Sequence, residues 1–373
     1  MKTFLKIFLI FFILDFLIAS TILKKIKFFP KEIWEDQYWR IKSDIYHHDL
    51  LPNVDIIESW GFNLKKRLVT NSLGFRDFSN KIIEKETDKK RVLLIGDSFI
   101  EGAGYDYEYT IGGLLQNYLG DDFEILNSAV SSYSPSIYYK KINHYLSKGY
   151  KFDQALVFLD VSDIFDELFI KIDNKDNIIT PKKKENTKKL KKKIYQLGTF
   201  LKTNTITFRF FYLISDQTEV YKNYLKLKYK ASKLMKKNFF KTNKEDVMFY
   251  RMTHIDRGYW TFNDEKYNYV RKGLKQSDKY LKKLFTLFDE NLIDSHLIIY
   301  PWPTQINFGD EKHQKYWLKF SKDNNIKFLN LYKAFTPEVK NKRKFIIDNF
   351  ILGDIHWNKV GNEKIFKEVL NLF

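Results

Sequence analysis

Two segments near opposite ends of the chain carry the residue types of a nucleophilic site. An apolar run at 91–96 leads directly into a Gly-Asp-Ser motif that ends at Ser98. This order places the Ser98 hydroxyl at the carboxyl end of a predicted buried strand, where open α/β sheets build their sites. Near the C-terminus, residues 354–358 read Asp-Ile-His-Trp-Asn. A hydroxyl near one end and an Asp/His pair near the other predict one hydrolytic site that the fold closes.

The residue types assign a role to each of three side chains. The imidazole of His356 can take the proton of the Ser98 hydroxyl and return it to a leaving group. Asp354, on a predicted loop, can orient His356 through the ring nitrogen that faces away from Ser98. Asn358 is expected to cap the helix that follows. We therefore predict a catalytic triad of Ser98, His356 and Asp354.

A serine nucleophile also needs hydrogen-bond donors for the oxyanion that forms on the substrate. The backbone N–H of Ser98, at a strand-to-helix turn, is expected to be one donor. The loop after the second predicted strand, 127–132, offers a second donor, and the end of the third strand, 160–163, offers a side-chain donor.

Alternating strand and helix patterns surround these segments. Strands are predicted at about 91–96, 124–130, 154–160, 295–300 and 326–331, with helices at 110–119, 133–147, 266–288, 312–323 and after 358. Strands that alternate with helices predict a parallel sheet that is covered on both faces. The expected fold class is α/β, a three-layer α/β/α, flavodoxin-like architecture with five parallel strands.

Two other parts of the chain interrupt this pattern. Residues 24–90 are expected to form an irregular connecting region, with a turn-like Asn-Ser-Leu-Gly-Phe-Arg-Asp stretch at 71–77. Residues 171–256 are Lys-rich and are expected to form a helical insertion that caps the site. The lysines fit either a solvated basic face or a surface for an acidic glycan or lipid, and the sequence leaves both open.

The N-terminal residues are almost wholly apolar. Residues 4–23 have about the length that spans a bilayer, with Lys6 and Asp15 as interruptions. Because a poor cleavage site follows, we predict an uncleaved transmembrane anchor over a cleaved signal peptide. More lysines follow this segment than precede it, which by charge alone favours a cytoplasmic body.

Composition limits the chemistry further. The 373 residues contain no cysteine, so disulfides, thiolate metal sites and a cysteine nucleophile are excluded. The net charge of +18 suits an acidic partner or reflects a Lys-rich composition, and no nucleic-acid partner is expected because no nucleic-acid module is present. The histidines lack metal-ligand spacing, so we expect neither a metal nor an organic cofactor.

The Gly-Asp-Ser motif, the Asn-initiated loop at 127–132 and the late Asp/His block together resemble the SGNH (GDSL-type) hydrolases. The resemblance covers about 91–165 and 295–373. It implies a serine nucleophile, a late His and Asp that complete the triad, and a Gly backbone and an Asn side chain that complete the oxyanion hole. The last two positions fall on Ser132 and on Ser162, which stands in Asp-Val-Ser-Asp where the family has Gly-x-Asn-Asp.

The resemblance also implies a function and a location. The Asp-x-His-Trp spacing at 354–357 is similar to that of bacterial alginate O-acetylation proteins, and 71–76 is similar to envelope-associated SGNH proteins. An SGNH hydrolase-like domain at 91–373 is then expected to be a serine esterase or O-acyltransferase. Its expected substrates are acylated, mainly O-acetylated, cell-envelope glycans or small esters. The location implied is the bacterial inner membrane, with the catalytic domain outside the cytoplasm.

Two features keep alternatives open. Trp302 and Trp357 either line a sugar subsite or pack in the core. Ser162, in the family's Asn position, motivates the alternative of a non-catalytic glycan-binding or assembly protein on a degenerate SGNH scaffold.

Overall fold

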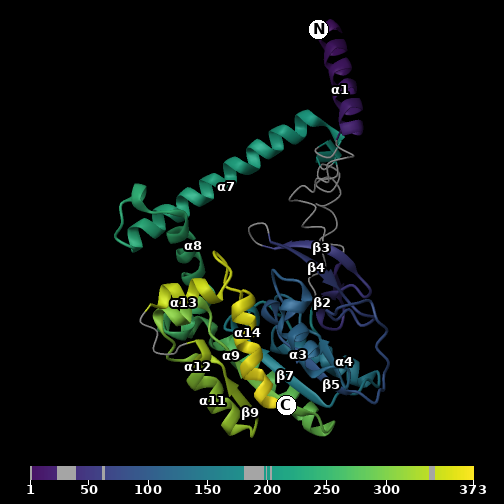
Figure 1. The fold of residues 1–373 in the computed structure, drawn as a ribbon, viewed down its shortest axis with the longest axis vertical. Coiled ribbons are helices and arrows are strands. Elements are labelled where there is room, and N and C mark those ends of the chain that lie inside the picture. Colours follow the sequence, from purple (N-terminus) through teal and green to yellow (C-terminus); the bar gives the residue numbers. More distant parts are fainter. Residues whose placement is uncertain are drawn as a thin grey trace. The chain divides into compact units, whose positions relative to one another are not determined.

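The computed structural model describes residues 2–22, 39–60, 64–179, 197–198, 200–201, 204–335 and 341–373 (Figure 1). The chain divides into two compact units, which are described separately. The larger unit is Trp39–Thr180 with Asn243–Phe373, and the smaller is Met1–Tyr38 with Pro181–Thr242. Residue 23, residues 24–38 of the predicted connecting region and the lysine runs at 182–193 lie outside the described residues.

The larger unit is built on a five-stranded parallel sheet. Its strands, in the order β6-β5-β7-β8-β9, are Phe123–Asn127, Lys90–Ile95, Gln154–Leu159, Asp294–Ile299 and Lys327–Asn330. Every neighbouring pair is parallel, with Leu94 opposite Asn127 and Leu156. The predicted five parallel strands are therefore confirmed, and the order is that of a flavodoxin-like, doubly wound sheet. The last four residues of β5, Val92–Ile95, and the last five of β7, Ala155–Leu159, are all apolar and buried because helices cover both faces of the sheet.

Helices flank this sheet, as expected where parallel strands are joined by helical crossovers. α3 (Ile111–Leu119) packs against α14 (Lys359–Val369), whereas α4 (Pro135–Ser147) packs against α9 (Asp264–Glu290). These two pairs form the outer layers of the predicted three-layer α/β/α architecture. As expected, Asn358 caps α14, because its side chain accepts from the N–H of Gly361.

The remaining helices of this unit are short and lie between the main elements. They are α2 (Ser98–Glu101), η3 (Tyr107–Tyr109), α5 (Asp163–Asp166), α8 (Lys244–Thr253), η5 (Asp256–Thr261), α10 (Pro303–Phe308), α11 (His313–Asp323), α12 (Tyr332–Phe335), α13 (Lys342–Asn349) and η6 (Leu370–Leu372).

The prediction of an irregular connecting region is wrong for the residues from 39 onward. They form two antiparallel hairpins, β1 (Arg40–Ser43) with β2 (His47–Leu50) and β3 (Asp55–Trp60) with β4 (Leu64–Val69). The sequence did not predict these strands, because charged residues stand at buried positions where an apolar residue would mark a strand. Glu58 and Lys66 are each 1% exposed and neutralise one another at 3.2 Å.

The stretch at 71–77 joins these hairpins to the sheet. The side chain of Asn71 accepts from the N–H groups of Leu73 and Phe75, which closes a tight turn. Arg76 is fully buried, and its N–H donates to the carbonyl of Asn127 at the end of β6. The Arg76 guanidinium donates to the carbonyls of Glu101, Gly102 and Tyr105. Through Arg76, the segment 71–77 is therefore hydrogen-bonded to the turn that follows α2.

The smaller unit consists largely of two helices and includes part of the predicted insertion. α1 (Lys2–Ile22) contacts α7 (Ile206–Leu234), and η4 (Phe239–Lys241) follows α7. Asp15 is 7% exposed, and its Oδ1 accepts from the N–H of Ile206 at 2.9 Å, at the first turn of α7. A buried carboxylate is stabilised there by the positive end of the helix.

The transmembrane prediction for 4–23 is not supported. The segment does form a helix, but among the described residues no helix has the length and apolar character needed to cross a membrane. Lys6 and Asp15 interrupt the apolar sequence of α1, and Asp15 is engaged by α7.

Candidate active site

The turn from β5 into α2 places Ser98 at the carboxyl edge of the sheet. Asp97 caps α2, since its Oδ1 accepts from the N–H of Phe99 at 3.0 Å. A glycine is needed at position 96, just before Asp97, because a Cβ there would lie 2.7 Å from the side chain of Ile100. At the other end of α2, Gly102 has φ +83°, and a side chain would collide with Thr110. Ser98, the first residue of α2, is half-buried.

The structure brings Ser98, His356 and Asp354 together. The Ser98 Oγ lies 2.8 Å from Nε2 of His356, across 258 residues of sequence. Nδ1 of His356 lies 2.5 Å from Oδ1 of Asp354. Because a carboxylate only accepts, Nδ1 carries the proton and Nε2 is left to accept from the Ser98 hydroxyl. This is the arrangement in which an imidazole serves as a general base.

The electrostatics of Asp354 suit this arrangement. Burial raises the pKa of its carboxyl, but the neighbouring charge and hydrogen bonds of His356 outweigh burial and lower that pKa to about 2. Asp354 therefore stays ionised through the neutral range and can hold the imidazole in one tautomer.

Two of the predicted oxyanion donors, both backbone N–H groups, have no acceptor in the part of the chain that the structure describes. Neither the N–H of Ser98 nor that of Ser132 donates to an acceptor among the described residues. Ser132 is exposed and has φ +65°, a left-handed conformation that favours glycine. The residue type at this position differs from the Gly of the family pattern, but the backbone conformation is one that a glycine adopts.

Ser162 is predicted to donate to an oxyanion, but its donors are already engaged. It is 2% exposed, and its N–H donates to Oδ1 of Asp160 at 2.5 Å. Its hydroxyl also interacts with the Asp160 carboxyl. Because both donors are engaged by a neighbouring side chain, the prediction that Ser162 donates to an oxyanion is not supported.

Burial decides between the two interpretations of Trp302 and Trp357. They are 0% and 1% exposed, so neither ring is available to stack on a sugar. Trp302 donates its Nε1–H to Oδ2 of Asp160 at 2.7 Å, and Trp357 packs against Phe99 and Tyr300. The sugar-subsite expectation is therefore wrong, and the core-packing alternative holds.

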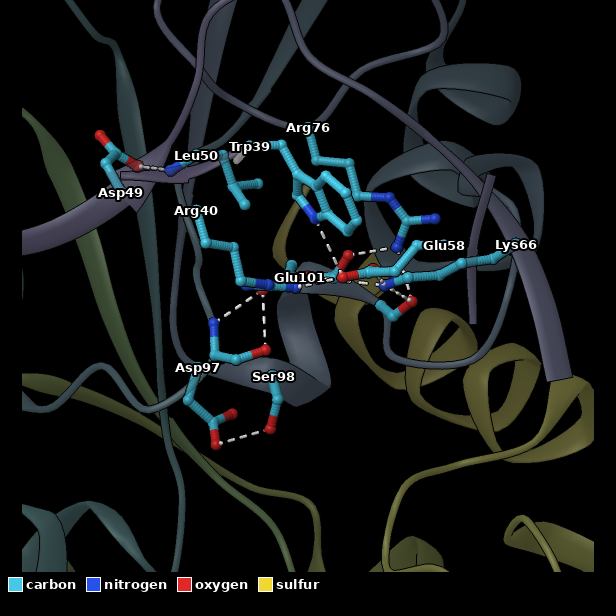
Figure 2. Close-up of polar contacts among 12 residues, drawn as sticks. Trp39, Arg40, Asp49, Leu50, Glu58, Lys66, Arg76, Asp97, Ser98 and Glu101 are labelled. Atoms are coloured by element: carbon cyan, nitrogen blue, oxygen red, sulfur yellow. Dashed lines mark hydrogen bonds and ion pairs between the residues drawn. The ribbon is translucent and has the colours of Figure 1, made fainter. Parts of the chain in front are cut away.

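Two functional candidates escaped the sequence prediction. Trp60, on β3, donates its Nε1–H to Oδ2 of Asp354 at 3.3 Å, and its ring meets the His356 ring edge to face, with centroids 5.1 Å apart. Glu101 closes α2 and is fully buried with two cations close to its carboxylate (Figure 2). No pattern pointed to Trp60. For Glu101 the signal was its position three residues after Ser98, on the same short helix.

A buried group of three carboxyls lies directly behind Ser98. Single oxygens of Asp97, Asp160 and Asp163 lie within 4.8 Å of one another, which makes this the candidate metal group of the described residues. Donors already surround these oxygens: the N–H of Phe99, the N–H of Ser162, the N–H of Asp160 and Nε1–H of Trp302, together with the hydroxyls of Ser98 and Tyr138. Such a donor set fits carboxyls that share protons better than it fits a cation.

The electrostatics of the group agree with this interpretation. Burial, and then the carboxyls of Asp97 and Asp160, raise the pKa of Asp163 well above its usual value. Burial and Asp160 do the same for the pKa of Asp97. One oxygen of Asp163, Oδ1, has no hydrogen-bond partner in the described structure.

No family model and no curated protein matches the chain. Among solved structures, the chain is similar to TesA, with 10% identity and a TM-score of 0.39, over 76% of this chain and 97% of that one. It is also similar to the psychrotrophic esterase EstA from Pseudoalteromonas sp., in a structure inhibited by monoethylphosphonate, with 12% identity and a TM-score of 0.37, over 76% and 96% of the two chains.

A member of the lipolytic protein G-D-S-L family from Veillonella parvula is similar at 11% identity and a TM-score of 0.36, over 76% of this chain and 98% of that one. This family name is the one that the motif at Ser98 resembles. At such identities and TM-scores the likeness carries no functional argument, so the case for function rests on the geometry of the site.

The carboxyl group predicts a pH-dependent effect of Asp163→Asn on stability. The native pKa of Asp163 is raised, so its stabilising contribution is present below the unfolded pKa of about 3.9 and is lost as pH rises through the native pKa. Asparagine does not titrate, and its oxygen can still accept from Tyr138 and from the N–H of Asp160. Urea unfolding should therefore show the variant gaining on the order of 1 kcal/mol over the natural protein between pH 5 and pH 8.

Asp323→Asn, on the exposed end of α11, is the matched control and should show no such gain. An equal effect of Asp163→Asn at both pH values would contradict the proton-sharing interpretation.

Proposed function

We propose that this protein is a serine esterase or O-acyltransferase in which Ser98 is the nucleophile, His356 the general base and acid, and Asp354 the group that orients His356. The observation that carries the proposal is the continuous hydrogen-bonded series from Ser98 Oγ through His356 to Asp354, at 2.8 and 2.5 Å. A series of this kind activates a serine hydroxyl on many unrelated folds.

The reaction proceeds in two halves. Ser98 Oγ attacks the carbonyl carbon of an ester while its proton moves to Nε2 of His356, and the carbonyl oxygen becomes an oxyanion. The N–H groups of Ser98 and Ser132, which have no acceptor among the described residues, are the proposed donors to that oxyanion. The carbon–oxygen bond to the alcohol then breaks, and the alcohol leaves with the proton from His356.

The second half regenerates the enzyme. Water, or a hydroxyl of an acceptor molecule, attacks the acyl group on Ser98 while His356 takes its proton. The bond from the acyl carbon to Ser98 Oγ then breaks, and Ser98 recovers its proton from His356. Water gives an esterase, and a glycan hydroxyl gives an O-acyltransferase. The proposed substrate class, O-acetylated cell-envelope glycans, rests on the resemblance of the motifs.

A second candidate function follows from Ser162. Because Asp160 engages both its N–H and its hydroxyl, the side-chain donor implied by the resemblance is missing. Loss of one oxyanion donor typically lowers turnover by roughly 10²–10³. This observation favours the alternative of a glycan-binding or assembly protein that uses the same surface without turnover.

The decisive test is turnover of p-nitrophenyl acetate by the full chain. We expect measurable hydrolysis that falls at least about 10³-fold in Ser98→Ala, because the nucleophile is lost. A fluorophosphonate probe should label Ser98 alone, as shown by peptide mapping. Ser147→Ala removes an exposed hydroxyl that bonds only within α4, and it should leave the rate unchanged. Glycan binding without turnover or labelling would favour the alternative, and labelling elsewhere would overturn the mechanism.

Trp60 offers a test of how Asp354 is held. Trp60→Phe keeps an aromatic ring against His356 but removes the N–H that donates to Asp354. A hydrogen bond to an ionised carboxylate is worth about 1.5 kcal/mol, so kcat should fall roughly tenfold with little change in KM. Trp317→Phe is the matched control, because the Nε1–H of Trp317 has no partner in the described structure. Equal losses in both variants would assign the effect of Trp60 to general packing.

We also propose that the protein acts at the bacterial inner membrane, attached through α1 with the larger unit outside the cytoplasm. What supports attachment is the set of apolar side chains that α1 exposes, among them Phe8 at 60% and Phe11 at 54%. Apolar surface of this kind gains free energy when lipid covers it.

Cell fractionation tests this location. The full chain should sediment with membranes, and protease added to spheroplasts should digest the larger unit. The pair Phe8→Glu and Phe11→Glu should shift most of the protein to the soluble fraction. Phe240→Glu, at a residue that is 87% exposed on η4, should not. A natural chain that is already soluble would refute the attachment.

A further inference from the structure

Glu101 ties the helix of the nucleophile to the segment that carries Ser132. It is the last residue of α2, three residues after Ser98, and none of its side chain is exposed. Oε2 of Glu101 accepts from the backbone N–H of Ser131 at 2.7 Å and from the Ser131 hydroxyl at 2.8 Å. Ser131 immediately precedes Ser132. The Glu101 carboxylate therefore links α2, which begins at Ser98, to the residue next to the second proposed oxyanion donor.

His48 holds the same segment from the other side. Its Nε2 lies 2.9 Å from the carbonyl oxygen of Ser131. Burial lowers the pKa of His48 to about 4, so the ring is neutral at pH 7, and a carbonyl partner requires the proton on Nε2. The Ser131 carbonyl and the Ser132 N–H belong to one planar trans peptide and point in opposite directions. A hydrogen bond that holds the carbonyl therefore orients the N–H.

The charge of Glu101 is sustained by residues from the N-terminal hairpins (Figure 2). Arg40 makes a bidentate contact with its carboxylate at 2.7 and 3.0 Å, and Lys66 approaches Oε1 to 3.5 Å. Arg76 binds the backbone carbonyl of Glu101 itself. Burial alone raises the pKa of Glu101, but the charges of Arg40 and Lys66 reverse the effect and hold that pKa well below its usual value. A full negative charge is thus available to bind both donors of Ser131.

We propose that Glu101 and His48 are positioning residues that fix the Ser131–Ser132 peptide so that its N–H serves the oxyanion hole. The β1–β2 and β3–β4 hairpins are then part of the active site, because they supply His48 and the cations around Glu101. This inference rests on the proposed function of Ser98. It accounts for the left-handed Ser132, whose conformation is held by neighbours on both sides, and it assigns a role to a histidine whose sequence context gave no sign of one.

The experiment measures kcat and KM for p-nitrophenyl acetate in the full chain. Glu101→Gln removes the charge that binds Ser131 and should lower kcat by about 10²-fold, with KM changed less than about threefold, because an oxyanion donor acts in the transition state. His48→Phe keeps a ring against Tyr133 but removes the donor to Ser131, and kcat should fall about tenfold. His48→Gln retains an N–H donor and should recover most of that loss.

Glu58→Gln is the matched control. Glu58 is an equally buried carboxylate that binds Arg40, Lys66 and Trp39, and within the described ranges no hydrogen bond or ion pair joins it to α2 or Ser131. Thermal unfolding should show that it weakens the fold as Glu101→Gln does, while kcat stays within about threefold of the natural value. If Glu101→Gln does not fold, the His48 pair decides the question alone.

The outcomes separate the two proposals. Folded Glu101→Gln and His48→Phe proteins with unchanged kcat would overturn the positioning role, and so would an equal loss in Glu58→Gln or no recovery in His48→Gln. If the natural protein neither turns over ester nor labels at Ser98, the proposed function itself fails.

Discussion

The hydrogen bond between Ser98 and His356 is the contact on which the site depends, and it joins groups 258 residues apart. Only the sheet makes that contact possible. Parallel strands end at one common edge, so the turn after β5 and the loop before α14 meet there although most of the chain lies between them. The burial of β5 and β7 supplies free energy that opposes the entropy of closing so long a loop.

The site also depends on residues that precede the sheet in the sequence. Arg40 and Lys66 come from the hairpins, and together with Arg76 they surround the buried Glu101 with opposite charges. Glu58, on β3, pairs with the same Arg40 and Lys66. Buried charges are tolerated only when each has partners, so the Glu101 carboxylate depends on Arg40 and Lys66 to stay charged. The hairpins therefore cannot be treated as a linker that merely precedes a complete domain.

Behind Ser98 the same edge of the sheet is packed with aromatic rings and carboxyls. Trp302 and Trp357 fill the core, and the Asp97, Asp160 and Asp163 carboxyls are enclosed by hydrogen-bond donors. Ser162 has no donor left for an oxyanion, since Asp160 accepts from both its N–H and its hydroxyl. The proposed oxyanion donors are therefore the backbone N–H groups of Ser98 and Ser132, and the second of these depends on the left-handed conformation at Ser132.

The amino-acid sequence by itself determined the alternation of strands and helices, the parallel sheet, and the identities of Ser98, His356 and Asp354, because these follow from local periodicity and from residue chemistry. It also placed Asn358 at a helix start. Burial could not be predicted in the same way. By residue type, Glu58, Lys66 and Arg76 would be expected at the surface, and Trp302 and Trp357 would suit a surface or a core equally. Only the tertiary structure decided that the first three form an interior ionic group, that both tryptophans are packed, and that Trp60, His48 and Glu101 surround the site. The physical reason is that burial and partnership depend on contacts between distant segments, which no local pattern of residues records.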